Sequence, residues 1–296
     1  MTIFREREIV HGMNAEISRL LEDVGGLVTL PQVFLRISQL VDDPQSSLSD
    51  IAKAASHDPA FTLRMLRVAN SAFYGFPSAI DTVDRAVSVI GTTQMRNLAL
   101  SMSVASSFAG LPNDLVTMDN FWRHSLYCAL IARALAREVR GCDPSAVFTA
   151  GLLHDIGELV LFNRLPEKAR ASLLLVLDEA DDLPVYRAEQ RIIGFDHAEV
   201  GGELAKRWGL PELLVECIAC HHDIGRADRH PRETALVHLA NILAQMAELD
   251  LHAMDDVPPV DPAAWVLTGL DESIVEQVVY EARREIAETH ELFFGS

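Results

Sequence analysis

Phe148-Thr149-Ala150-Gly151-Leu152-Leu153-His154-Asp155-Ile156-Gly157-Glu158 is an apolar run that ends in a histidine–aspartate pair, a glycine and a charge. Apolar neighbours bury the pair, and buried His and Asp side chains need hydrogen bonds, an opposite charge or a metal ion. Consecutive residues of a helix point in different directions, so His154 and Asp155 can share one ion only where the helix ends or tightens. Gly157 is expected to provide that ending. The pair therefore predicts partners from other parts of the chain.

The composition is that of a folded protein with a large negative charge. Of the 296 residues, 49% are hydrophobic and 23% are charged, which is enough for one large or two ordinary domains. The net charge of -18 has the wrong sign for a broad nucleic-acid surface, which needs clustered Lys and Arg. We find no apolar run of about 20 residues and no apolar signal core near the N-terminus. We therefore expect a cytoplasmic protein, without a nucleic-acid or membrane partner and with reduced cysteines.

Apolar residues recur at helical spacing almost throughout, and strand signals are nearly absent. An Asp followed by Pro predicts an N-cap and a first helical residue, and this pair occurs three times, at Asp58-Pro59, Asp143-Pro144 and Asp261-Pro262. His57 is therefore interpreted as the residue before a cap. Longer helices are predicted over residues 121–139 (with Asp119 as N-cap), 145–155, 167–180, 185–193, 198–208, 211–222, 233–249 and about 272–292.

These helices predict an all-α fold with two lobes that meet near residues 108–119, around the loop Gly110-Leu111-Pro112-Asn113-Asp114. We divide the chain into an N-terminal helix (1–24), an N-terminal helical lobe (25–112), a second helical lobe (113–252) and a C-terminal helical extension (253–296). Burial is predicted in the first lobe for Leu63, Leu66, Val87 and Ile90, and in the second for Leu130, Leu152 and Leu239.

Five histidines and one carboxylate come from four separate helices: His124, His154 with Asp155, His197, and His221 with His222. Helical bundles build metal sites from inward side chains of facing helices, and imidazole suits divalent transition metals. A single histidine on an apolar face is more often a hydrogen-bonded core residue, and the chain has six further histidines. Only the joint order and spacing therefore support a metal site.

The run Cys217-Ile218-Ala219-Cys220-His221 matches the attachment pattern of c-type haem. That attachment needs export, so no haem is expected. Zinc held by the two cysteines and the histidines is a second interpretation, but structural zinc sites usually have a second close pair of ligands. We favour core packing of both thiols.

The second half of the chain resembles the HD superfamily of metal-dependent phosphohydrolases, and the first half narrows the resemblance to the HDOD domain. The stretches that carry it are Leu30-Pro31, 57–63, Arg67-Val68-Ala69-Asn70-Ser71-Ala72-Phe73-Tyr74-Gly75, 86–91 and 151–157. The likeness covers roughly residues 25–250, and residues 69–75 are quite specific. It implies a bacterial signalling module with an all-helical, two-lobed fold, an HD-like second lobe and often no demonstrated catalysis.

The resemblance to the related HD-GYP phosphodiesterases also implies ligands for a divalent Fe, Mn, Zn or Ni ion: His124, His154, Asp155, His197, His221 and His222. Three features depart from that pattern. Asn241 replaces an Asp, Glu158 replaces a Lys, and Asp223-Ile224-Gly225 stands where the Gly-Tyr-Pro loop is expected. Asn offers a metal no negative charge, and Glu158 would repel a phosphate.

Three functions follow as hypotheses. The first is a signalling module without robust catalysis, which binds a protein partner in trans, or a nucleotide-type ligand, in a degenerate pocket with Asn241, Glu158 and His238. The second is a metal-dependent phosphohydrolase of a nucleotide or cyclic dinucleotide, with Asp155 as its catalytic residue. The third is a scaffold whose histidines only pack, with Asn241 hydrogen-bonded to His238 one turn earlier. The departures favour the first hypothesis, and the five histidines keep the second open.

Overall fold

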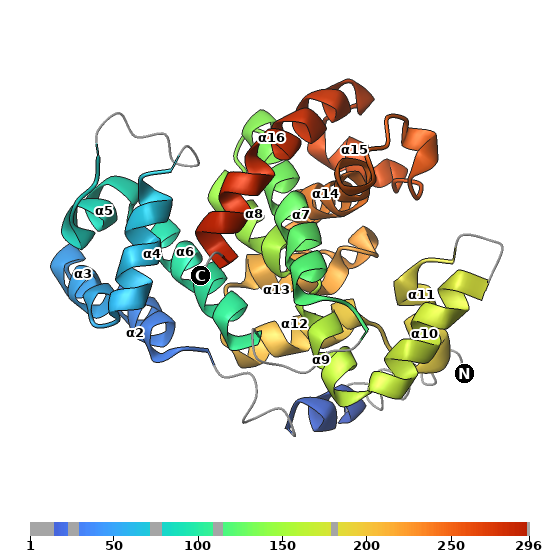
Figure 1. Ribbon diagram of the computed structural model, residues 1–296, viewed down its shortest axis with the longest axis horizontal. Coiled ribbons are helices and arrows are strands. Elements are labelled where there is room, and N and C mark those ends of the chain that lie inside the picture. Colours follow the sequence, from blue (N-terminus) through green and yellow to red (C-terminus); the bar gives the residue numbers. More distant parts are fainter. Residues whose placement is uncertain (1–14, 23–29, 72–78, 109–114, 179–182, 295–296) are drawn as a thin grey trace.

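The computed structural model (Figure 1) is built of helices, many of which begin at a residue whose side chain caps the first turn. Asp58, Asp143 and Asp261 each accept a backbone N–H in the first turn of the helix that follows, and each helix has proline in its first turn. Ser47 and Asp50 form a reciprocal capping box, which satisfies two backbone donors at once. The Asp-Pro pairs were therefore correctly predicted as helix starts.

The structure describes residues 15–22, 30–71, 79–108, 115–178 and 183–294. Residues 15–22 are helical, as predicted for the N-terminal helix, whereas the first part of that helix and the loop at 110–114 lie outside the described residues. The remaining α-helices are α2 (Gln32–Asp42), α3 (Leu48–Ser56), α4 (Pro59–Ala69), α5 (Val83–Ile90), α6 (Thr92–Phe108), α7 (Met118–Glu138), α8 (Pro144–Leu153), α9 (Ile156–Arg164), α10 (Pro166–Asp178), α11 (Val185–Ile192), α12 (His197–Arg207), α13 (Glu212–Cys220), α14 (Pro231–Leu249), α15 (Pro262–Thr268) and α16 (Val275–Phe294).

The described residues contain helices and no strand, so the predicted all-α fold with two lobes is confirmed. Helices α2 to α6 form one bundle, and α7 to α14 form the second, HD-like lobe (Figure 1). Helix α16 packs along α7 and also reaches α4 in the first lobe. Its Phe294 ring stacks on Trp122 of α7, with 5.0 Å between the ring centroids. The C-terminal helix is therefore part of the second lobe's core.

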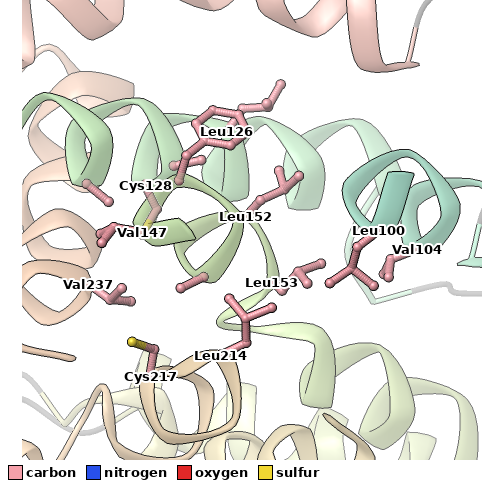
Figure 2. Close-up of a cluster of buried hydrophobic side chains, with 14 of the residues drawn as sticks. Leu100, Val104, Leu126, Cys128, Val147, Leu152, Leu153, Leu214, Cys217 and Val237 are labelled. Atoms are coloured by element: carbon pink, nitrogen blue, oxygen red, sulfur yellow. The ribbon is translucent and has the colours of Figure 1, made fainter. Parts of the chain in front are cut away.

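Helix α8 lies at the centre of the second lobe, where residues 147–153 are all buried. Figure 2 shows its side chains between those of four neighbouring helices: Leu100 and Val104 of α6, Leu126 and Cys128 of α7, Leu214 and Cys217 of α13, and Val237 of α14. Among the described residues, one stretch, Pro144–Arg164, has the length and composition to cross a membrane, although we found no such apolar run in the sequence. Of its most apolar window, 83% is buried inside the protein.

Most predicted core positions are buried, but two on α4 are wrong. The side chain of Leu63 is 61% exposed and Leu66 is only partly buried. Phe61, Met65 and Val68 fill the core instead, because positions separated by four and three residues share one face of a helix. The cap of α7 is also corrected, since Thr117 rather than Asp119 accepts an N–H from its first turn.

The predicted core packing of the two thiols in the haem-like run is confirmed. Cys217 and Cys220 are both buried and free. The hydroxyl of Thr234 lies 3.8 Å from the Cys217 sulfur, and burial is the main cause that raises the pKa of that thiol above its usual range. The two thiols therefore behave as small apolar residues of the core.

Candidate metal centre

The chain bends between α8 and α9, at the histidine–aspartate pair. Helix α8 ends at Leu153, and Asp155 leaves helical geometry, with φ −99° and ψ 12°, before α9 begins at Ile156. The Nδ1–H of His154 donates to the carbonyl of Gly151 at 2.8 Å. Because the helix is interrupted here, these consecutive side chains face the same interior point. The predicted interruption exists, but it lies before Gly157.

Gly157 has a different role from the predicted helix ending. It lies in the first turn of α9, where a Cβ atom would be 1.9 Å from the carbonyl oxygen of His197 and 2.7 Å from the backbone nitrogen of Gly201. Any side chain would therefore force α9 and α12 apart. The glycine lets the first residue of α12, His197, approach the backbone that carries Asp155.

The four other histidines reach this point from α7, α12 and the end of α13. His124 lies on α7, and His197 follows Asp196, which caps α12 in a capping box with Glu199. His221 and His222 follow the last residue of α13, where the chain leaves the helix. This exit allows both to face the interior, although adjacent residues within a helix would point in different directions.

Asp155 is the common neighbour of the histidines. Its Oδ1 lies 3.3 Å from Nε2 of His197 and 3.5 Å from Nε2 of His221. Its Oδ2 lies 3.0 Å from Nε2 of His154 and 3.7 Å from Nε2 of His124. Each carboxylate oxygen therefore faces a different pair of imidazoles.

The outward nitrogens of these four rings all have hydrogen-bond acceptors. Nδ1 of His197 lies 2.7 Å from Glu189, and Nδ1 of His124 lies 2.8 Å from Glu248. Nδ1 of His154 and His221 each donate at 2.8 Å to a backbone carbonyl. An acceptor at Nδ1 holds the proton there and leaves the lone pair of a neutral ring on Nε2, which faces Asp155.

His222 completes one side of the cluster. Its Nε2 lies 2.9 Å from Nε2 of His197, and its ring stacks on Tyr186 of α11 at 4.2 Å between centroids and an angle of 11°. Because the Nδ1 of His197 is committed to Glu189, the two facing Nε2 atoms need a proton or a cation between them.

The structure places the three predicted pocket residues differently. Asn241 joins the cluster, with its Oδ1 3.1 Å from Nε2 of His124. The Glu158 carboxylate lies beside Glu189 and His197, whereas His238 lies behind the cluster. Its Nδ1–H donates to the His221 carbonyl at 2.8 Å and its Nε2 accepts the N–H of Asp261 at 3.1 Å. Neither ring nitrogen is therefore available to a ligand, and the bond to Asn241 that belonged to the scaffold hypothesis is absent.

Electrostatics differ sharply among these groups. Burial acts to lower the pKa of His154 and of His197, but the negative charges of Asp155 and Glu189, respectively, outweigh it and hold both well above the usual value. Burial would raise the pKa of Asp155, yet the charge of His154 holds it well below its usual range. Burial lowers the pKa of His221 to about 4. Burial and then the negative Asp155 raise the pKa of Glu158 to about 8.

The donor set fits divalent transition metals. Two groups of ligand atoms lie within 4.8 Å of one another and share Asp155: the His197 half (Asp155, His197, His221, His222) and the His124 half (His124, His154, Asp155). Nitrogen ligands lie about 2.0–2.1 Å from zinc, so neighbouring ligand atoms of one ion are roughly 3 Å apart or slightly more. Buried Nε2 atoms of His154 and His221 and Oδ1 of Asp155 have no hydrogen-bond partner, so these atoms are available to a cation once each ring has lost its Nε2 proton.

The sequence did not reveal three side chains that support the cluster. Glu189 and Tyr186 lie on α11, in a run whose polar residues gave no sign of an inward face. Glu248 lies on α14 seven residues after Asn241, and this spacing of two turns puts both on one helix face. This spacing between Asn241 and Glu248 was the one signal in the sequence that could have linked Glu248 to the cluster.

This geometry agrees with the comparison to known families. The sequence profile of the HDOD domain matches residues 27–224, and the chain therefore belongs to the HDOD domain family. The match ends before α14, so Asn241 and Glu248 lie outside the matched region.

Individual proteins of similar sequence or structure extend the comparison. An HDOD domain protein of unknown function from Geobacter sulfurreducens has a TM-score of 0.74 and 26% identity, covering 95% of this chain and 99% of that one. A candidate phosphohydrolase from Shewanella amazonensis has a TM-score of 0.70 and 26% identity, covering 93% and 96%. Ribonuclease Y of Chloroflexus aurantiacus is 27% identical over 226 residues, covering 70% of this chain and 38% of that protein. An uncharacterised Treponema pallidum protein is 27% identical over 231 residues, 77% of this chain, which spans 44% of that protein's length.

Proposed function

We propose that this chain is a bacterial signal-transduction module in which a metal-loaded HD pocket binds a phosphate-containing small ligand or a protein partner, with little turnover. The observation that carries the proposal is the convergence of four histidines on Asp155, with His222 facing His197 beside them. The Nε2 atoms of His154 and His221 are buried without a hydrogen-bond partner. A cluster that only packed would satisfy these atoms, because an unpaired buried polar group costs about 1–3 kcal/mol. The scaffold hypothesis is therefore disfavoured.

Each side chain has a definite task in this proposal. A bound divalent ion would supply Lewis acidity toward a phosphoryl oxygen. Asp155 holds both halves together through its two oxygens, and the imidazoles present Nε2 inward because their Nδ1 atoms have acceptors. His154 and His221 are fully buried, whereas His124 and Asn241 on one side and His222 on the other are partly exposed, so a phosphate group would reach the pocket along these partly exposed side chains.

Two side chains argue for binding rather than robust turnover. The side chain that approaches His124 is the neutral amide of Asn241. Among this amide and the three residues of the His124 half, Asp155 is therefore the only anionic ligand. The Glu158 carboxyl lies near Asp155 and Glu189 and adds no cation to the pocket. A phosphoryl transition state gains negative charge and is stabilised by cations aimed at it. This pocket lacks the lysine that the HD-GYP pattern places there.

The second candidate is a metal-dependent phosphohydrolase. One observation favours it: the nitrogen ligands expected from the HD pattern are all present and directed at Asp155 or at one another, in two halves that could hold two ions. Two ions about 3.5–4 Å apart can stabilise both the attacking and the leaving oxygen of a phosphodiester. The two candidate functions therefore differ in the expected rate of phosphodiester hydrolysis and not in the residues that would hold the metal ions.

Activity in a matched pair of proteins separates these candidates. We expect the wild type to hydrolyse cyclic dinucleotides and a nitrophenyl phosphodiester slowly or not at all with Mn²⁺ or Fe²⁺. The Asn241→Asp, Glu158→Lys double variant should be faster, because one lost electrostatic contact typically costs about a hundred- to a thousandfold in rate. Single variants serve as controls. Rapid turnover by the wild type would establish the phosphohydrolase instead.

Metal binding should release protons. In the metal-free protein the negative charges of Asp155 and Glu189 hold the pKa values of His154 and His197 above the usual value, which favours the protonated rings, and an ion that binds their Nε2 atoms must displace protons. Affinity is therefore expected to fall as the pH is lowered, by about tenfold per pH unit for each proton released. Titration calorimetry with Mn²⁺ in two buffers of different ionisation heat counts the protons. An affinity independent of pH between 6 and 8 would contradict this account.

A further inference from the structure

Two buried or partly buried carboxylates support the cluster from outside. Oε2 of Glu189, whose residue is 2% exposed, accepts both the ring Nδ1–H of His197 at 2.7 Å and its backbone N–H at 2.9 Å. Oε2 of Glu248 lies 2.8 Å from Nδ1 of His124, and its other oxygen lies 3.8 Å from Nε of Arg123. Each carboxylate therefore contacts the outward nitrogen of one inward-facing imidazole.

The two carboxylates belong to different halves of the centre. Glu189 supports His197 in the His197 half, and Glu248 supports His124 in the His124 half. In each half a second ring faces Asp155, namely His221 in the His197 half and His154 in the His124 half. Each of these two rings donates its Nδ1–H to a neutral backbone carbonyl. Each half thus has one imidazole backed by a negative charge.

The supporting residues of each half also come from different helices. On α11, Tyr186 and Glu189 are three residues apart on one face, and they contact His222 and His197 respectively. On α14, Asn241 and Glu248 share a face and both contact His124. Helix α11 packs mainly against α10 and has few contacts with α12, and its contacts with the cluster are made by Tyr186 and Glu189.

We propose that Glu189 and Glu248 are positioning residues, each of which sets the metal affinity of one half independently of the other. This inference rests on the proposed metal-binding function. A carboxylate at Nδ1 fixes the ring tautomer and orientation and makes Nε2 a stronger donor to a metal, and losing such a partner typically lowers metal affinity about 10- to 100-fold. The position of α11 then governs the His197 half, whereas α14 governs the His124 half.

The test uses the full-length chain with Glu189→Gln and Glu248→Gln. Glutamine keeps an acceptor oxygen and the side-chain volume, so the fold should persist, and thermal unfolding of the metal-free proteins checks this. Calorimetric titration with Mn²⁺ and the visible spectrum of the Co²⁺-loaded protein report each ion's environment. We expect two ions in the wild type and a roughly 10- to 100-fold weaker affinity for one ion in each variant.

Double variants identify the half that each carboxylate serves. Glu189→Gln combined with His222→Ala should lower the affinity for one ion only, the ion of the His197 half. Glu189→Gln combined with Glu248→Gln should lower the affinity for both ions. The inference is overturned if either single variant leaves both affinities and the Co²⁺ spectrum unchanged, if it weakens both ions equally, or if the wild type saturates with one ion. If the wild type binds no ion at all, the proposed metal-binding function itself is wrong, and this result differs from each of the three results that overturn only the inference about Glu189 and Glu248.

Discussion

Asp155→Asn is expected to empty both halves of the candidate metal centre. The two oxygens of Asp155 face four imidazole Nε2 atoms at 3.0–3.7 Å, so this residue is the one carboxylate common to both groups of ligand atoms. Asparagine keeps the shape but removes the negative charge and one of the two acceptor oxygens. A change at an outer partner already lowers metal affinity about 10- to 100-fold, and the loss of a shared ligand should exceed that range.

Metal content after gel filtration measures the effect. The matched control is Asp143→Asn, the same chemical change at the cap of α8, because asparagine caps helices as well as aspartate does. The control should retain the metal content of the wild type. An Asp155→Asn protein that keeps its full metal content would show that the carboxylate does not hold the ions.

Gly157→Ala should destabilise the fold strongly. A Cβ atom at this position would lie 1.9 Å from the carbonyl oxygen of His197, and that contact is with backbone, which no rotamer change can relieve. Helices α9 and α12 would have to separate by more than 1 Å, which would also draw His197 away from Asp155. Overpacking of cores usually costs about 1–3 kcal/mol, and a backbone clash of this severity should reach about 3 kcal/mol or more of unfolding free energy.

Urea denaturation of the metal-free protein measures this change. Gly225→Ala is the control, because its Cβ would meet nothing closer than 3.6 Å and its backbone needs no left-handed conformation. The control should alter the unfolding free energy by less than about 0.5 kcal/mol. Equal stability of the two variants would mean that the close approach of α9 and α12 is not required.

Much of the fold could be predicted because its signals are local. Asp58-Pro59, Asp143-Pro144 and Asp261-Pro262 mark helix starts through hydrogen bonds within one turn, and these bonds are present. Leu63 was predicted to be buried because apolar residues are dense along α4. It is exposed, because which face of α4 is buried depends on how the helix packs against its neighbours. The break before α9 was predicted, yet its position at Asp155 depends on contacts that short-range patterns do not contain.

The candidate site was predictable as a set of ligand types and not as an arrangement. The order of the histidines and the HD resemblance indicated which side chains to consider, and the structure brings those side chains together. His238 was assigned to the pocket by proximity along α14, but its two ring nitrogens bond to backbone groups behind His221. Glu189 was missed because its partner, His197, lies on another helix.

The metal content of the purified wild-type protein tests the central claim most directly. The two groups of ligand atoms that share Asp155 predict one or two equivalents of Fe, Mn, Zn or Ni retained through gel filtration, and their removal by a chelator at low pH. Elemental analysis of the protein as isolated, and again after incubation with Mn²⁺, Fe²⁺ and Zn²⁺ followed by gel filtration, gives the answer. Retention of less than about 0.1 equivalent of every metal under both conditions would contradict the proposal that this HDOD protein contains a metal-binding pocket.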